Sequence, residues 1–511
     1  MNAILRNRLS RSQRRIQRRL DKSKPVRGHR PVLAASNIHY EIGERVHGIS
    51  YGGIGAFHLL AQKIGLVDRI NQCLHLLKIY LPYHESDHVL NIAYNSLCNG
   101  DCVQDIELRR NDINFLDALG AERIPDPTTA GDFCRRFDED AINTLQDVYD
   151  DVRAGVWRRQ PTAFFDRAIL DADGTLVETA AEKKEGIDIA YDGTWGYHPL
   201  LVTLANTGEV MRLINRPGNR PSHEGAADAF DRAMATCLRG GFRKVLLRGD
   251  TDFSQTKHLD RWNNDGRIDF IFGFDARANL VDIAENLPEN AWQPLHRRGP
   301  PPPKTEPRQR RPNLKDPIVR QRQFETLRLQ SEEIAEFPYR PTACQTEYRM
   351  VVVRKNISKE KGELRLLDDI RYFFYITNQW SPKAADIVLA PKGANGRCQQ
   401  ENLIEQHHNG VHALRAPLDT LLSNWAYMVM TSLAWHLKAW AALMLPETGR
   451  WSEQYRADKA WLLGIEFKTF INALIAIPCQ IVKQARRIIY RVLNYNPYQR
   501  IFFRLLDVLR C

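Results

Sequence analysis

The chain of 511 residues exceeds one ordinary domain of about 100 to 200 residues, so we expect about two to four domains with sizeable cores. Apolar residues make up 43% of the chain and charged residues 26%, a composition that is typical of soluble globular proteins and excludes intrinsically disordered and membrane-spanning classes. The formal net charge of +11 favours a polyanionic partner such as nucleic acid or an acidic membrane surface.

The nine cysteines are odd in number and scattered, which favours reduced thiols in a cytosol over a disulfide framework. The closest pair, in "CNGDC" (98–102), lacks a second pair at zinc-ligand spacing, so ordinary packing is favoured there over metal binding. No apolar segment follows the charged N-terminus, so we expect no secretory signal. The apolar stretch 425–446 contains His436 and Lys438, and it therefore predicts a buried helix rather than a membrane span.

Residues 1–30 are rich in arginine and have almost no apolar face, which predicts a mobile basic arm that binds DNA. The arginines of this arm that we expect to contact DNA are Arg14, Arg15, Arg18 and Arg19. Residues 31–160 repeat apolar residues at helical spacing and predict a helical DNA-binding domain. Its segment "IPDPTTAGDFCRRF" combines a turn with a helix, and Arg135 and Arg136 are compatible with a helix-turn-helix reader of DNA.

The period changes near residue 161, where short β-rich runs separated by Gly and Asn turns begin. "AFFDRAILDAD", "TLVETAAE", "PLLVTLANTGEVMRLINR", "KVLLRGD" and "IDFIFGF" predict strands, and two helical stretches lie on either side of "KVLLRGD". The order β-β-β-α-β-α-β is that of a ribonuclease-H-like domain. We therefore predict an α/β fold in which residues 161–275 form the first part of a ribonuclease-H-like catalytic core.

The remaining chain departs from this core. Residues 276–392 predict a β-rich insertion that begins with a basic, Pro-rich loop, in which Arg310 and Arg311, directly after Gln309, are candidate DNA contacts. Residues 393–425 return to helical text and predict the catalytic helix that completes the core, and residues 426–511 predict a helical C-terminal region.

Aspartates follow two of the predicted strands. In a ribonuclease-H-like fold the first and fourth strands are parallel neighbours. We therefore expect Asp173 in "LDADG" and Asp250 in "LLRGD", which are 77 residues apart in the sequence, to lie close together. Asp173 is favoured over Asp171 because it stands at the strand end, although the two share a face, and Asp250 is favoured over Asp252 because it directly follows the strand.

Carboxylates in this arrangement can hold two divalent metal ions about 4 Å apart, when a third acid joins them from a later helix. Mg²⁺ prefers oxygen ligands, and the short aspartate side chain limits the freedom of such a site. We therefore expect two Mg²⁺ ions, for which Mn²⁺ can substitute.

The two strand-end acids and the segment "RCQQENLIEQHHNG" resemble a bacterial insertion-sequence DDE transposase, with insertion sequence family 1380 of the IS-four-like group as the nearest resemblance. That group carries a Tyr-x2-Arg-x3-Glu-x6-Lys signature around its third acid. Arg397 and Glu401 match the Arg-x3-Glu part, whereas Ala394 replaces the Tyr and His408 replaces the Lys. The resemblance implies Glu401 as the third acid, with Glu405, one helical turn later, as its alternative.

The resemblance also implies a function. Such an enzyme cleaves double-stranded DNA at the terminal inverted repeats of its element and joins the ends to target DNA, with Asp173, Asp250 and Glu401 as catalytic metal ligands. Because two element ends must be joined at once, we expect a homodimer in the synaptic complex, in the bacterial cytoplasm at the nucleoid and without a membrane.

Two other functions remain open from the residues. "DADGT" resembles the nucleophile motif of haloacid-dehalogenase-type phosphatases, in which the first aspartate, here Asp171, attacks phosphorus. The strands that follow Asp173 form a predicted meander, which disfavours that fold. A DNA-binding protein without catalysis would also explain the basic charge, but it has no need of three acids that face an anionic substrate.

Overall fold

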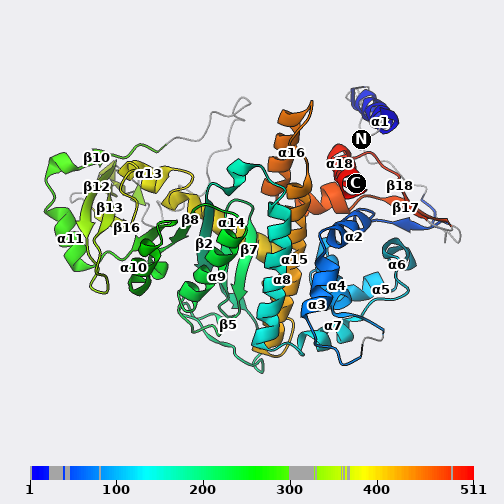
Figure 1. The fold of residues 1–511 in the computed structure, drawn as a ribbon, viewed down its shortest axis with the longest axis horizontal. Helices are drawn as coiled ribbons and strands as arrows, with labels where there is room; N and C mark the ends of the chain where they lie inside the picture. The colour runs from blue at the N-terminus through cyan, green and yellow to red at the C-terminus, as the bar shows by residue number, and fades with distance from the viewer. Residues whose placement is uncertain are drawn as a thin grey trace.

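A nine-stranded mixed sheet runs through one half of the protein in the computed structural model, on the left in Figure 1. The structure describes residues 3–21, 38–40, 46–79, 82–297, 327–328, 331–357, 359–360, 363–364, 369–484 and 487–510. The sheet strands, in their spatial order, are β10 (Gln293–Pro294), β12 (Ser331–Tyr339), β13 (Tyr348–Asn356), β16 (Ile370–Thr377), β9 (Ile268–Phe274), β8 (Val245–Gly249), β2 (Ala168–Gly174), β6 (Leu200–Leu204) and β7 (Glu209–Ile214). The fold is mixed α/β.

The predicted neighbourhood of the first and fourth core strands is confirmed. β2 pairs in parallel with β8, and β8 pairs in parallel with β9. β6 and β7 form an antiparallel hairpin on the other side of β2. The predicted helices on either side of β8 are also present, as α9 (Ala226–Arg239) and α10 (Thr256–Asn264).

The segment "TLVETAAE" does not join this sheet. It contributes only β3 (Val177–Glu178), which pairs with β5 (Trp195–Tyr197), and β5 pairs with β4 (Asp188–Ile189) in a separate small sheet. The prediction of a main-sheet strand there is wrong. The run ends after a few apolar residues, and the acidic and small residues that follow have no apolar face to bury.

The β-rich segment after residue 276 extends the nine-stranded sheet. β16 pairs antiparallel with β9, and β13 and β12 continue the sheet to its edge. The accompanying elements are α11 (Ala278–Glu285), η4 (Glu289–Ala291), α13 (Ala384–Leu389) and a small sheet of β11 (Leu327–Arg328), β14 (Lys359–Glu360) and β15 (Glu363–Leu364).

Helices from both ends of the chain pack together on the other side of the molecule. The N-terminal group is α2 (Ile54–Lys63), α3 (Leu66–Cys73), α4 (Glu85–Leu97), α5 (Ile106–Arg110), α6 (Ile113–Leu119), α7 (Pro127–Cys134) and α8 (Glu139–Trp157). The C-terminal group is α15 (Leu421–Met444), α16 (Ser452–Gly464), α17 (Phe467–Phe470) and α18 (Gln499–Arg510). Figure 1 shows α8 and α15 side by side between the sheet and the N-terminal helices.

Helix α15 is the predicted buried helix. Every residue from Ser423 to Met444 is buried, and the helix contacts α4, α8, α16 and β7. A continuously apolar helix of this kind belongs in a protein core. Its burial leaves no face of this helix for a contact with another subunit. In the described part of the chain, no helix is long and apolar enough to cross a membrane.

Both ends of the chain differ from the sequence predictions. Residues 3–21 of the predicted mobile arm form an α-helix, α1 (Ala3–Asp21). The C-terminal region is not wholly helical, because β17 (Cys479–Gln484) and β18 (Arg487–Val492) form a hairpin that pairs with β1 (Gly48–Ile49). The β-branched pairs Ile481-Val482 and Ile488-Ile489 of this hairpin favour strands, but the basic residues around them obscured this signal in the sequence.

Lys438 on α15 is a buried lysine, and burial of its charged form lowers the stability of the protein. Its side chain is 1% exposed, and its Nζ donates to the Leu463 carbonyl at 2.8 Å and lies 4.0 Å from the Trp435 ring centroid. Burial lowers the pKa of Lys438 to about 7. Below that pH the ammonium is buried in its charged form, and between pH 7 and the ordinary lysine pKa the unfolded state binds more protons, so stability rises with pH.

We therefore expect Lys438→Met to raise Tm by a few degrees at pH 6 and by much less at pH 9, measured by scanning calorimetry. The control is Lys257→Met, at an exposed position of α10. An equal gain for Lys438→Met at both pH values would contradict this account.

Candidate active site

Strands β2 and β8 present three successive pairs of residues on one face of the sheet. Ile169 lies opposite Leu246, and Asp171 lies opposite Arg248. Because alternate residues of a strand share a face, the next pair is Asp173 and Asp250, at the ends of the two strands. Along this face, the first pair packs in an apolar cluster with α13. The second pair is oppositely charged, and the third pair places two carboxylates at the strand ends.

The charged pair is buried and fully engaged. Arg248 Nε donates to Asp171 Oδ1 at 2.7 Å, and Nη2 donates to Oδ2 at 2.7 Å. The side chains are 2% and 1% exposed. Both Asp171 oxygens therefore accept from one guanidinium, which is the bidentate geometry of an ionised carboxylate with arginine.

Asp173 and Asp250 share a different arginine. Arg397 Nη1 lies 2.9 Å from Asp173 Oδ2, and its Nη2 lies 3.6 Å from Asp250 Oδ2. The guanidinium thus lies between the two carboxylates. Arg397 and Asp173 are 18% and 17% exposed, and Asp250 is 37% exposed, so the group lies at the surface of the sheet edge and is reachable from solvent.

Burial raises the pKa of Asp173 to about 6 and also raises that of Asp250, although the charge on Arg397 opposes both shifts. Their mutual repulsion raises the pKa of Asp173 further. Although burial alone would lower the pKa of Arg397, the charges on Asp173 and Asp250 raise it. The two carboxylates therefore require a cation, and an arginine supplies it here.

The two candidate glutamates lie on α14 (Cys398–Asn409), which follows η5 (Ala394–Arg397). Glu401 is in the first turn of α14, and its charge contributes to the raised pKa of Asp250. Glu405 instead accepts a 3.5 Å hydrogen bond from Asn409. Burial lowers the pKa of His408, and the charge on Glu405 opposes that shift. Asp252 is exposed, and its backbone N–H donates to Asp250 Oδ1 at 3.1 Å.

Other contacts that sequence reasoning missed hold α14 on the sheet. Gln400 is 2% exposed and accepts a hydrogen bond from Thr203 of β6. His408 Nε2 lies 3.0 Å from Thr175 Oγ1, just after Asp173. His408 thus contacts protein at the position where the transposase signature has lysine. Arg248 was also missed, although its place two residues before Asp250 on the same face was a usable signal.

The candidate DNA contacts differ in their surroundings. Arg14, Arg15, Arg18 and Arg19 are exposed on α1, and Arg136 is exposed after α7. Arg135 pairs with Asp132 at 2.9 Å and with Asp419 at 2.8 Å, so its guanidinium already has acidic partners. Arg310 and Arg311 lie outside the described residues.

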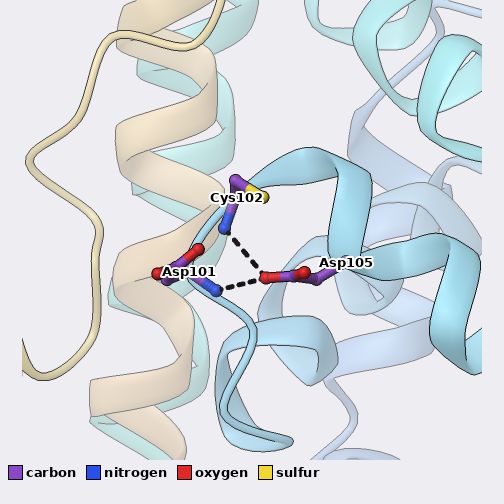
Figure 2. A group of neighbouring side chains, drawn as sticks. All are labelled: Asp101, Cys102 and Asp105. Carbon is purple, nitrogen blue, oxygen red and sulfur yellow. Dashed lines mark hydrogen bonds between the residues drawn. The ribbon is translucent and has the colours of Figure 1, made fainter.

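Within the described ranges, one group of three potential metal ligands has all its ligand atoms within 4.8 Å of one another: Asp101, Cys102 and Asp105. Figure 2 shows that the Asp105 carboxylate accepts from the backbone N–H groups of Asp101 and Cys102, at 2.8 and 3.4 Å. These bonds cap the short helix η1 (Val103–Asp105) and explain the group without a metal.

Asp173, Asp250 and Glu401 do not meet that distance criterion in this structure. The chemistry of Asp173 and Asp250 nevertheless fits a divalent cation, because their carboxylate oxygens, of like charge, face the Arg397 guanidinium that lies between them. The guanidinium lies where a cation between the two carboxylates would lie, so Arg397 and a metal ion would compete for this position.

Comparisons with known proteins identify the family of the chain. A family model described as "Transposase DDE domain group 1" matches residues 39–511. No curated protein sequence matches the chain. Among solved structures, a chain of the "Cryo-EM structure of piggyBac transposase synaptic complex with hairpin DNA" is 8% identical, with 82% of this chain and 86% of that chain covered and a TM-score of 0.33. A likeness this distant does not by itself assign a fold or an activity.

The competition between Arg397 and a metal ion can be measured. We expect Arg397→Gln to lower Tm in a chelator, because Asp173 and Asp250 then repel without a cation. Added Mg²⁺ should raise the Tm of this variant more than that of the unaltered protein, because a ligand stabilises the folded state according to its affinity. Arg340→Gln, at an exposed position after β12, is the control. An equal Mg²⁺ effect in all three proteins would contradict the competition.

Proposed function

Because the chain belongs to the DDE transposase family described as Transposase DDE domain group 1, we propose that Asp173, Asp250 and Glu401 are its catalytic metal ligands. The observation that carries this assignment is the convergence of Asp173 and Asp250 on one cation at the ends of two parallel strands. The effect of the Glu401 charge on Asp250 favours Glu401 over Glu405. The engagement of both Asp171 oxygens favours Asp173 over Asp171.

The catalytic core is ribonuclease-H-like in this proposal. The strand order β7-β6-β2-β8-β9, with β6 antiparallel to its neighbours, supports it. Residues 161–275 form the first part of the core, the β-rich segment 276–392 extends its sheet, and residues 393–425 complete it with α14. Residues 31–160 form the DNA-binding domain, and residues 426–511 pack against both.

Asp173, Asp250 and Glu401 would hold two divalent ions, Mg²⁺ in the cell, and these ions would supply charge stabilisation for phosphoryl transfer. The three carboxylates hold this site at the sheet edge, where DNA phosphate can approach. Water attacks phosphorus at the element end, the P–O3′ bond breaks, and a 3′-hydroxyl leaves. That hydroxyl then attacks a phosphorus of target DNA, and the target's own 3′ oxygen leaves. Arg397, released from Asp173 and Asp250, is available to pair with a phosphate oxygen.

The substrate is double-stranded DNA with the terminal inverted repeats of a bacterial insertion sequence similar to family 1380, bound by a homodimer in the cytoplasm. The phosphatase alternative is disfavoured, because it requires Asp171 to attack phosphorus although that carboxylate is 1% exposed and bound twice by Arg248. A protein that only binds DNA would not need two neighbouring carboxylates, Asp173 and Asp250, that converge on one cation.

Conservative replacement tests the three acids singly. We expect Asp173→Asn, Asp250→Asn and Glu401→Gln each to lower excision of DNA that carries the element ends by roughly a thousandfold or more, because metal stabilisation of several kcal/mol is lost. DNA binding, measured by gel shift in parallel, should be retained.

Glu405→Gln is the matched control, one turn along the same helix, and it should excise like the unaltered protein. If a folded, DNA-bound variant of Asp173, Asp250 or Glu401 keeps normal excision, that residue leaves the catalytic trio. Loss of excision in Glu405→Gln with Glu401→Gln active would exchange the two glutamates.

The exposed arginines of α1 test the basic arm. Changing Arg14, Arg15, Arg18 and Arg19 together to Gln should weaken DNA binding. The slope of log K against log salt should become shallower by about 0.9 for each phosphate that the variant no longer neutralises. Arg135→Gln is the control, because its guanidinium is already paired with Asp132 and Asp419. An unchanged salt slope in the α1 variant would exclude this helix from the DNA interface.

A further inference from the structure

The Arg248 side chain joins three segments that are far apart in the sequence. Its Nε and Nη2 donate to Asp171 on β2, as described above. Its Nη1 donates to the Gly393 carbonyl at 2.9 Å and to the Pro391 carbonyl at 3.3 Å, in the loop before α14. One guanidinium on β8 therefore ties the strand of the first acid to the loop that leads to the third.

The loop closes tightly on this guanidinium. A Cβ atom at Gly396 would lie 2.0 Å from the Pro391 carbonyl oxygen and 2.4 Å from Arg248 Nη1. No side chain fits there without moving Arg248 or the loop. The close fit shows that the contact between Arg248 and the loop is a packed, defined interface and not a chance approach of a long side chain.

The position of this contact matters for the site. Asp173 and Asp250 each lie two residues beyond a member of the buried pair. On the loop side, Gly396 is followed directly by Arg397, and Glu401 lies four residues further along, in the first turn of α14. Residues of β8 and β9 also contact η5. The guanidinium is therefore linked through short stretches of chain to every charged group of the candidate site, and the stretch to Glu401 is the longest.

We propose that Arg248 is the positioning residue of this site, an inference that rests on the proposed metal-binding function. By holding Asp171 and the loop 391–396 together, Arg248 sets the position of Arg397 and Glu401 against Asp173 and Asp250. It thereby sets the affinity of the three acids for divalent cations. Arg248 does not contact the metal or the DNA itself.

The chain contains a matched control for this arrangement. Arg349 on β13 is 3% exposed, pairs with Glu336, and donates to the carbonyls of Gln379, Trp380 and Pro382. Like Arg248, it is a buried arginine on a strand of the nine-stranded sheet, and it joins a carboxylate to a loop. None of its partners belongs to the candidate site. A general loss of stability from a damaged buried arginine should appear in both variants.

The first experiment measures Mn²⁺ binding to the full chain by isothermal titration calorimetry. Lysine cannot bind a carboxylate through two parallel bonds and also reach two carbonyls. We expect Arg248→Lys to weaken Mn²⁺ binding about 10- to 100-fold, as is typical when a group that orients metal ligands is lost. Arg349→Lys should lower Tm to a similar extent and leave Mn²⁺ affinity unchanged.

A kinetic readout separates positioning from a structural role. The Mn²⁺ concentration that gives half-maximal DNA cleavage should rise in Arg248→Lys by the same factor as the dissociation constant. Saturating Mn²⁺ should restore most of the cleavage rate, which it cannot do for a variant that is merely unfolded. A reduced rate at every Mn²⁺ concentration, without a shift of the midpoint, would overturn the inference.

A second variant keeps the inference falsifiable if Arg248→Lys does not fold. Gly396→Ala pushes the loop away from Arg248 and leaves the buried pair intact, so it should also weaken Mn²⁺ binding. Gly266→Ala is its control, because a Cβ there meets nothing within 4 Å. Normal Mn²⁺ affinity in Gly396→Ala would refute the positioning role.

The failure of this inference differs from the failure of the proposed function. If Asp173→Asn binds Mn²⁺ as tightly as the unaltered protein, the metal site itself is misplaced, and the positioning role falls with it. If Asp173→Asn abolishes binding whereas Arg248→Lys and Gly396→Ala bind normally, the metal site stands and only the role of Arg248 is refuted.

Discussion

The buried ion pair of Asp171 and Arg248 is the constraint on which the rest of the site depends. Removing two charges from water costs several kcal/mol for each ion, and the cost is offset only when the remaining donors and acceptors are satisfied. Here both carboxylate oxygens accept, and Nε, Nη1 and Nη2 of the guanidinium all donate. A shift of either strand by one residue would turn these charges into the apolar face. The pair therefore fixes the register of β2 against β8, and with it the place of the two carboxylates at the strand ends.

The sequence predicted the acids of this site better than it predicted their surroundings. Alternation along "ILDADG" and "VLLRGD", together with the parallel pairing of two strands, brings Asp173 and Asp250 to one edge, and that pairing is present. The choice between Asp171 and Asp173 could not be made from alternation, because the two share a face. It depends on the partner of each: Arg248, 77 residues after Asp171, and Arg397, 224 residues after Asp173. Only the folded chain shows which arginine each carboxylate meets.

Local pattern was sufficient where one residue period dominated. The segment of α15 is apolar on all sides, so burial was its only stable outcome, and the helix is buried. Local pattern failed where long-range partners decide. β17 and β18 are short strands that carry basic residues, and their sheet is completed by β1, which lies near the other end of the chain. Residues 276–392 were predicted to be β-rich, but the attachment of their strands to the core sheet through the pairing of β16 with β9 is a tertiary fact that no local period encodes.

The same electrostatics that favour a metal at this site also keep it occupied by the protein's own cation. Burial disfavours the charged forms of Asp173 and Asp250 and raises both pKa values, and the charge on Asp250 raises the pKa of Asp173 further, whereas the charge on Arg397 opposes both shifts. Arg397 supplies that charge from the helical segment that also carries Glu401. Arg397 and Glu401 are four residues apart on this one helical segment, so the position of the segment on the sheet sets both the guanidinium and the glutamate against the two aspartates. That position is set where the segment starts, because Arg248 donates to the Gly393 carbonyl and Gly396 leaves no room for a side chain between the loop and the guanidinium.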